Sequence, residues 1–214
     1  MRLDIEQNTE EWYKARCGKF TGSPADLFFV KGKNKDEIGA GLLTYIDEIV
    51  TERLTTPSTG EYIDPRQWGH DHEDEAHEVY EMTKGFVKVT KGGFFTRTEY
   101  TGSSPDGEID NGKGITEVKC PANSVNHYKT FTSGEVPKKH IPQIVWNMRE
   151  AEVEYCDFIS YDPRFINPEH RIFIKRVYLK DFPKENELLD KKLKIVIEMV
   201  EDKLEAVNSL KLVR

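Results

Sequence analysis

Apolar residues recur at helical spacing in two long stretches of the chain. Between residues 39 and 54 they return every three or four positions, which is the period of one helix face. A second stretch with the same period follows Pro183. The first stripe comprises Leu42, Leu43, Ile46, Ile49, Val50 and Leu54, and the second Leu189, Leu193, Val196, Val200, Leu204 and Val207. Both patterns predict helices that bury one face.

Shorter patterns predict strands between these helices. Runs rich in β-branched and aromatic residues predict strands at 86–89, 94–98, 155–161 and 171–179. The first two runs and the hairpin at 102–119 are expected to form a meander. Further helices are predicted after an Asn8 cap, after a Ser23 cap, at 67–83 and from 138 onward, with a helix or loop at 122–133. This mixture of elements predicts an α/β fold.

The stretch from Gly102 to Pro121 contains the densest candidate chemistry. Asp110-Asn111-Gly112 is a strong hairpin turn signal, and Ile115–Lys119 is typical of a short strand. Because side chains alternate along a strand, Glu117 and Lys119 share one face. The turn lets the chain double back and bring Asp106 beside Glu117, so that two carboxylates and an ammonium converge.

Such a group suits a magnesium ion. Mg²⁺ prefers oxygen ligands and is usually held by one or two carboxylates with waters and substrate phosphate. Asp106 and Glu117 can supply carboxylates, the carbonyl of Val118 can point to the same edge, and Lys119 can balance charge in a transition state. The alternative is a solvated hairpin with an ordinary cross-strand ion pair.

Two other segments carry candidate binding groups. Arg16 lies shortly before Ser23-Pro24, which has the pattern of a helix start, and helix N-termini favour anions. These residues predict either a phosphate pocket or a surface arginine beside a capped helix. In the acidic run that contains Glu73, the alternatives are histidine metal ligands at His70 and His72, a solvated face, or one acid directed into the site.

Composition restricts the class of protein. The chain has 214 residues, a net charge of -7 and 32% charged residues, which predicts one water-soluble globular domain. The negative charge argues against a protein that coats nucleic acid, although a local basic patch can still hold phosphate. Three separated cysteines fit a reducing cytoplasm, and neither a signal peptide nor a membrane span is expected.

These motifs together resemble the phage lambda exonuclease and YqaJ-like viral recombinase family, part of the PD-(D/E)xK nuclease superfamily. The resemblance rests first on Ser104-Pro105-Asp106-Gly107 and on Glu117-Val118-Lys119-Cys120-Pro121. It extends to the spacing from Arg16 to Ser23, to Trp68-Gly69 followed by Glu73, to the helix with Gln143, and to Tyr161-Asp162-Pro163-Arg164. It implies a single nuclease domain over residues 1–214, with a mixed central sheet flanked by helices and a restriction-endonuclease-like core.

The resemblance also implies roles for individual residues. The implied catalytic residues are Asp106, Glu117, Lys119, Glu73 and Gln143, and the implied ligands of Mg²⁺ are Asp106, Glu117, Val118 and Glu73. Two ions are expected, with Mn²⁺ as a possible substitute. A terminal 5′-phosphate would be held by Arg16, Ser23, Ser104 and Gln143. Val145 stands where the lambda enzyme's motif has a second glutamine, so no second amide is assigned.

The activity implied is 5′-to-3′ exonuclease digestion of linear double-stranded DNA that leaves 3′ overhangs for recombination. The same resemblance implies a homotrimer, a single-strand annealing protein as partner, and location in the cytoplasm, which is the host's if a phage encodes the chain. Two alternatives remain at this stage. One is a superfamily nuclease of endonuclease or opposite polarity, and the other is a non-catalytic DNA-binding recombination module.

Overall fold

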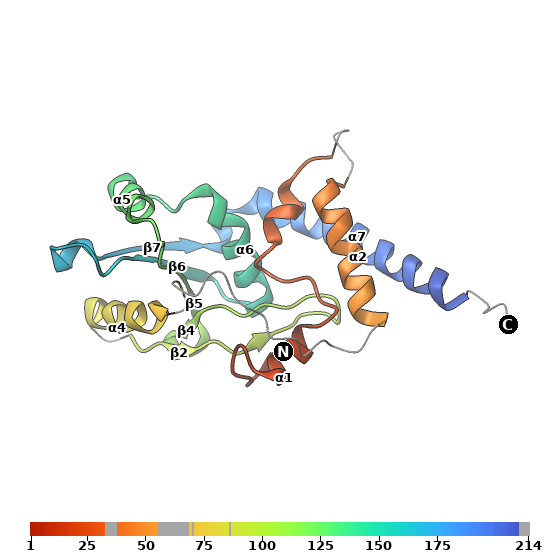
Figure 1. The fold of residues 1–214 in the computed structure, drawn as a ribbon, viewed down its shortest axis with the longest axis horizontal. Coiled ribbons are helices and arrows are strands. Elements are labelled where there is room, and N and C mark those ends of the chain that lie inside the picture. The colour runs from red at the N-terminus through yellow and green to blue at the C-terminus, as the bar shows by residue number, and fades with distance from the viewer. Residues whose placement is uncertain (33–37, 55–68, 70, 86, 210–214) are drawn as a thin grey trace.

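A five-stranded mixed sheet forms the centre of the fold. The computed structural model describes residues 1–32, 38–54, 69, 71–85 and 87–209. In sheet order the strands are β2 (Thr90–Lys91), β4 (Gly107–Ile109), β5 (Gly114–Lys119), β6 (Tyr155–Tyr161) and β7 (Ile172–Tyr178). β5 and β6 run parallel, while the other neighbours run antiparallel. The predicted mixed α/β sheet is therefore confirmed (Figure 1).

The expected meander is wrong in its first half. Residues 87–89 form no strand, and residue 86 lies outside the described residues. β3 (Phe94–Phe95) leaves the central sheet and pairs antiparallel with β1 (Arg2–Leu3). Of the strands expected before the hairpin, only the short β2 joins the central sheet, where it pairs with β4. The N-terminal residues supply the partner for β3, and local patterns do not reveal a pairing between segments so far apart in the sequence, such as Arg2 with Phe95.

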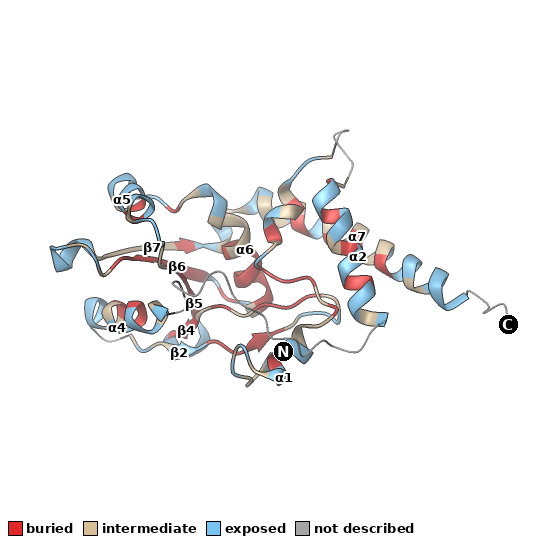
Figure 2. Ribbon diagram, viewed as in Figure 1, coloured by how far each residue is buried: buried red, intermediate tan, exposed pale blue. Residues whose placement is uncertain are grey.

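Helices cover both faces of the sheet, as Figure 1 shows. On one face α4 (Glu73–Lys84) packs Ala76 and Tyr80 in a cluster with Val118 and Ile159. On the other face lie α5 (Ser124–Ser133) and α6 (Ile141–Ala151). α6 packs Ile144 and Met148 in a cluster with residues of β5 and β6. Alternate residues of β5 thus face different helices, and its central residues are buried (Figure 2).

A third group of helices packs behind α6. α2 (Ala40–Leu54) and α7 (Pro183–Ser209) form a cluster with Val145 and Trp146 of α6. Both predicted stripes are confirmed at their centres and shorter than expected, because Leu43, Leu54 and Val207 are exposed. In the described residues no helix is both long and apolar enough to span a membrane.

The helix starts differ from the predicted ones. Thr9, not Asn8, caps α1 (Glu10–Arg16), and its side chain accepts a hydrogen bond from the Trp12 amide. Ser23 caps no helix, because only a five-residue 3-10 turn, η1 (Ala25–Phe29), follows Pro24. The remaining 3-10 turns are η2 (Asp110–Gly112), η3 (Lys138–His140), η4 (Pro168–His170) and η5 (Leu179–Asp181). Part of the helix expected at 67–83, including Trp68 and His70, lies outside the described residues.

Candidate active site

The β4–β5 hairpin brings Asp106 to the end of β5. Gly107 pairs with Thr116, and the tight turn places Asp110, Asn111 and Gly112 at positive φ. Glycine and asparagine tolerate this conformation best. Asp106 then accepts a hydrogen bond of 2.6 Å at Oδ2 from the Val118 amide. The proposed convergence of Asp106 with the Glu117–Lys119 segment is present in the structure.

Glu117 is fully buried beneath this convergence point and has two polar partners. One carboxylate oxygen forms an ion pair with the Lys119 ammonium. The other accepts a 3.0 Å hydrogen bond from Nδ2 of Asn147, on α6. Oδ1 of Asn147 accepts in turn from the Ser103 hydroxyl at 2.8 Å. Asn147 is itself buried, so this network fixes the orientation of Glu117.

Burial and neighbouring charges shift the pKa values of Glu117, Glu73 and Lys119. Burial raises the pKa of Glu117 to about 7, although the nearby Lys119 charge opposes the shift. Burial, together with the charges of Asp106 and Glu117, raises the pKa of Glu73 to about 9. Burial alone would lower the pKa of Lys119, but Glu117 and Asp106 outweigh it and raise this pKa. Negative charge is therefore crowded here beyond what one lysine offsets.

Nearly all the expected site residues line one cleft of about 410 Å³. Its lining includes Arg16, Ser23, Glu73, Ser104, Asp106, Val118, Lys119 and Gln143. Glu117 is the exception, because it lies buried behind its partner Lys119. Segments separated by more than 120 residues thus meet at one concave surface. This arrangement suits a ligand that offers several phosphate oxygens.

The acidic run at the start of α4 divides between two roles. Glu73 lines the cleft and is partly buried. Asp74 forms an ion pair with Lys91 at 3.1 Å, and Glu75 accepts a 2.8 Å hydrogen bond from the Tyr161 hydroxyl. Among these three acids, Glu73 is the one at the cleft, whereas the neighbouring pair is engaged in structural contacts.

Trp12 links two members of the expected phosphate pocket. Its indole N–H donates a 2.7 Å hydrogen bond to the Ser104 hydroxyl, and the Arg16 guanidinium lies 4.9 Å from the centre of its ring. Arginine over an aromatic face is held by a cation–π contact. Ser23 lies exposed at the cleft, but the expected long helix with its dipole is absent. Any anion binding there depends on side chains and not on a helix N-terminus.

The donor set fits a divalent cation, although the acids do not form a ready-made cage. In the described part of the chain no group of three or more histidine, cysteine or acidic side chains could hold a metal ion. The oxygens of Asp106 and Glu117 are hard ligands of the kind Mg²⁺ prefers, and Mg²⁺ commonly uses only one or two protein carboxylates. Burial is the main cause of the raised pKa values of Glu117 and Glu73, and a bound cation would favour their ionised forms.

A sequence match places the chain in a known family. Residues 11–154 match the YqaJ-like viral recombinase domain, and the chain belongs to this family. No curated protein sequence matches the chain.

Solved structures show the same fold across nearly the whole chain. The alkaline exonuclease LHK-Exo of Laribacter hongkongensis is 28% identical with a TM-score of 0.78, over 94% of this chain and 96% of its own. The structure of LHK-Exo in complex with dAMP is 27% identical with a TM-score of 0.77, over 93% of this chain and 96% of its own. A phage-related exonuclease of Haemophilus somnus 129PT shares the fold at 15% identity and a TM-score of 0.64, over 92% and 98%.

Three residues that position the site residues were not predicted from the sequence. Asn147 orients Glu117, Ser103 orients Asn147, and Trp12 contacts both Ser104 and Arg16. Asn147 lies one helical turn after Gln143, which was the only available signal. The functions of Ser103 and Trp12 arise from packing between distant segments.

Proposed function

We propose that this chain is a Mg²⁺-dependent 5′-to-3′ exonuclease that digests linear double-stranded DNA and leaves 3′ overhangs. Membership of the YqaJ-like family and likeness to LHK-Exo support exonuclease activity on DNA. The observation that carries the proposal is the meeting of Asp106, Glu117 and Lys119 at one end of β5. This group opens into a cleft that also contains Arg16 and Gln143.

The chain's own residues divide the work of hydrolysis. Asp106, Glu117, Glu73 and the Val118 carbonyl are the proposed holders of one or two Mg²⁺ ions, with Mn²⁺ as a substitute. When bound, the metal supplies positive charge to the scissile phosphate and its attacking water. Lys119 lies within reach of the same phosphate and stabilises charge that develops in the transition state. Asn147 keeps the buried carboxylate of Glu117 aligned throughout.

The cleft offers a second anion subsite for the 5′ end. Arg16 presents a planar fork of donors that matches phosphate oxygens, and Ser23, Ser104 and Gln143 line the same cleft. Arg16 is positioned by Trp12, so less entropy is lost when it binds phosphate. A terminal phosphate held there would place the adjacent phosphodiester at the acids. This arrangement explains how one end of the strand would be selected.

The proposal extends to assembly and partners. We propose a single nuclease domain over residues 1–214 that assembles as a homotrimer around DNA. Such a ring would keep the enzyme on its substrate between successive cuts, as a high effective concentration does. The 3′ strand produced would pass to a single-strand annealing protein in the cytoplasm, which is the host's if a phage encodes the chain. Family membership supports the recombination role.

The metal requirement tests the proposal directly. Wild type should digest linear duplex only with Mg²⁺ or Mn²⁺, and Asp106→Asn should abolish digestion while the protein keeps its thermal stability. The matched control is Asp74→Asn, since Asp74 pairs with Lys91. Digestion by Asp106→Asn at the wild-type rate would refute the assignment of the acids. DNA binding without any metal-dependent cleavage by wild type would favour a non-catalytic recombination module.

A further inference from the structure

A second hollow, of about 770 Å³, adjoins the candidate active cleft. One wall is α5 and the other is the segment 135–140, with Phe158 and Ser160 of β6 in its lining. We call this hollow the α5 groove. Lys119, Cys120 and Ala122 line both the α5 groove and the cleft, whereas Arg16 and Ser23 line only the cleft. The α5 groove therefore begins at the Lys119 end of the cleft and extends away from the candidate catalytic residues.

One face of α5 supplies the polar wall of the groove. The residues that line it are Asn123, Asn126, Lys129, Thr130 and Ser133. Their spacing of three or four positions places them along one side of the helix. The amides of Asn123 and Asn126 and the ammonium of Lys129 can donate hydrogen bonds to phosphate oxygens, whereas the hydroxyls of Thr130 and Ser133 donate to backbone carbonyls of the helix.

The rim of the groove is basic in a chain whose net charge is negative. Lys129, Lys138 and Lys139 are exposed, and within the described ranges none of them forms an ion pair. The acid on the same rim, Glu135, lies 3.4 Å from Lys175 and is partly neutralised by it. Three ammonium groups without partners beside a nuclease site are complementary in charge to a phosphate backbone.

The inner surface of the groove is apolar and aromatic. The His140 ring stacks on Phe158 with centroids 5.7 Å apart and an interplanar angle of 27°. Burial and the nearby charges of Lys119 and Lys139 lower the pKa of His140 to about 3, so the ring is neutral near pH 7. Val136 and Pro137 extend this surface. Phe158 is itself buried, so the partly exposed His140 ring is the aromatic surface on which a base could stack beneath the basic rim.

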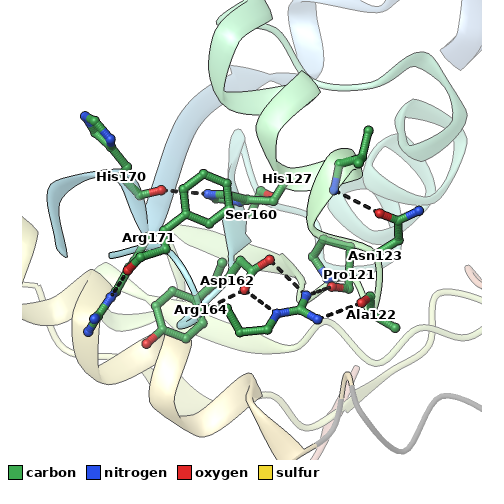
Figure 3. Close-up of polar contacts among 12 residues, drawn as sticks. Pro121, Ala122, Asn123, His127, Ser160, Asp162, Arg164, His170 and Arg171 are labelled. Atoms are coloured by element: carbon green, nitrogen blue, oxygen red, sulfur yellow. Dashed lines mark hydrogen bonds and ion pairs between the residues drawn. The ribbon is translucent and has the colours of Figure 1, made fainter. Parts of the chain in front are cut away.

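Polar contacts hold the α5 wall just before its first residue and within the helix. Arg164 pairs with Asp162 and donates 2.8 Å hydrogen bonds to the carbonyls of Pro121 and Ala122, which precede α5 (Figure 3). The fully buried His127 bonds the Ser160 hydroxyl and the His170 carbonyl, each at 2.8 Å. The groove is thus built on a supported frame, so little ordering is needed when a ligand binds.

We propose that the α5 groove binds the strand being cut, on the 3′ side of the scissile phosphate. The inference rests on the proposed exonuclease function. If the 5′-phosphate occupies the Arg16 side of the cleft and the bond to be cut lies at the acids, the rest of that strand continues past Lys119. The α5 groove begins there, and its lysines would hold the next few phosphates.

A charge-neutralisation experiment tests this path on both the protein and the DNA. The triple variant Lys129→Gln, Lys138→Gln, Lys139→Gln is compared with wild type in single-turnover cleavage of 5′-phosphorylated duplex. Removing three phosphate contacts should slow cleavage at subsaturating enzyme by roughly tenfold or more near 0.1 M salt. The deficit should shrink as salt rises. The control triple variant Lys113→Gln, Lys184→Gln, Lys194→Gln has the same net charge, and its positions lie in the hairpin turn and on α7.

The second arm replaces the second to fourth phosphates 3′ of the scissile bond with uncharged methylphosphonates. Wild type should lose rate on this substrate, while the groove triple variant should lose little more, because the same contacts are already gone. Equal sensitivity of the two proteins, or insensitivity of wild type, would overturn the groove assignment. Failure of wild type to cut unmodified duplex would instead overturn the proposed function, which keeps the two failures distinct.

Discussion

Replacing Glu117 by glutamine should stabilise the metal-free protein while abolishing its cleavage activity. Glu117 is fully buried, and burial raises its pKa from 4.5 to about 7. A raised carboxyl pKa means that the folded state prefers the protonated form. The associated stability is fully present below pH 4.5 and is lost as the pH rises through about 7. Glutamine stays neutral throughout, so it avoids this loss.

The expected gain follows from the size of the shift. The difference between the pKa of 4.5 in the unfolded chain and about 7 in the folded protein corresponds to about 3 kcal/mol of unfolding free energy at pH 8.5. In a chain of this length, that gain raises the melting temperature by on the order of 10 °C. The hydrogen bond from Asn147 survives the change, since a glutamine carbonyl also accepts. Lys119 loses its ion-pair partner but remains partly exposed and keeps Asp106 nearby.

The assay is thermal unfolding followed by circular dichroism, in chelator, at pH 5 and pH 8.5. Glu117→Gln should melt well above wild type at pH 8.5 and near it at pH 5. Glu78→Gln, at an exposed position of α4, is the control and should match wild type at both values. Added Mg²⁺ should stabilise wild type but not Glu117→Gln, because a ligand stabilises only the state that binds it. A variant that melts at or below the wild-type temperature at pH 8.5 would show that the ionised Glu117 does not destabilise the folded protein.

Three further predictions concern the 5′ end, the orientation of Glu117 and assembly. Arg16→Ala should slow cleavage of 5′-phosphorylated duplex strongly and of 5′-hydroxyl duplex little; equal slowing of both would remove Arg16 from the phosphate pocket. Asn147→Leu should cost about 1–3 kcal/mol of unfolding free energy in chemical denaturation, because it leaves one buried carboxylate oxygen of Glu117 and the Ser103 hydroxyl without their hydrogen-bond partner. It should also raise the Mg²⁺ concentration for half-maximal cleavage, and an unchanged requirement would contradict its positioning role. Light scattering should give three times the chain mass of 24.8 kDa, and a monomer at micromolar concentration would exclude the trimer.

Local patterns predicted the hairpin that carries the site because its signals are local. Asp110-Asn111-Gly112 specifies the turn, and the alternation along β5 places Glu117 and Lys119 on one face. The ion pair between them and the hydrogen bond from the Val118 amide to the Asp106 carboxylate agree with that pattern. The two apolar helical stripes were predicted equally well, because any helix that buries one face has apolar residues every three or four positions.

Features that depend on distant pairing were missed. β3 pairs with Arg2–Leu3, and no property of Phe94 or Phe95 indicates that partner. The predicted Ser23 cap failed because Ser-Pro also begins short 3-10 turns, whose length is decided by packing. The α5 groove was missed for a similar reason. Lys129 and Lys138 lie on different elements and meet only after α5 folds onto the sheet.

The most direct test of the central claim is the direction of digestion. Linear duplex is labelled uniformly in one strand, protected at its 3′ end by phosphorothioate linkages and left open at a phosphorylated 5′ end; a second duplex has the protection reversed. With Mg²⁺, a 5′-to-3′ exonuclease should release mononucleotides from the first substrate and very few from the second, with no release from either in chelator. Digestion only of the substrate with the open 3′ end, or metal-independent digestion of both, would contradict the proposed function.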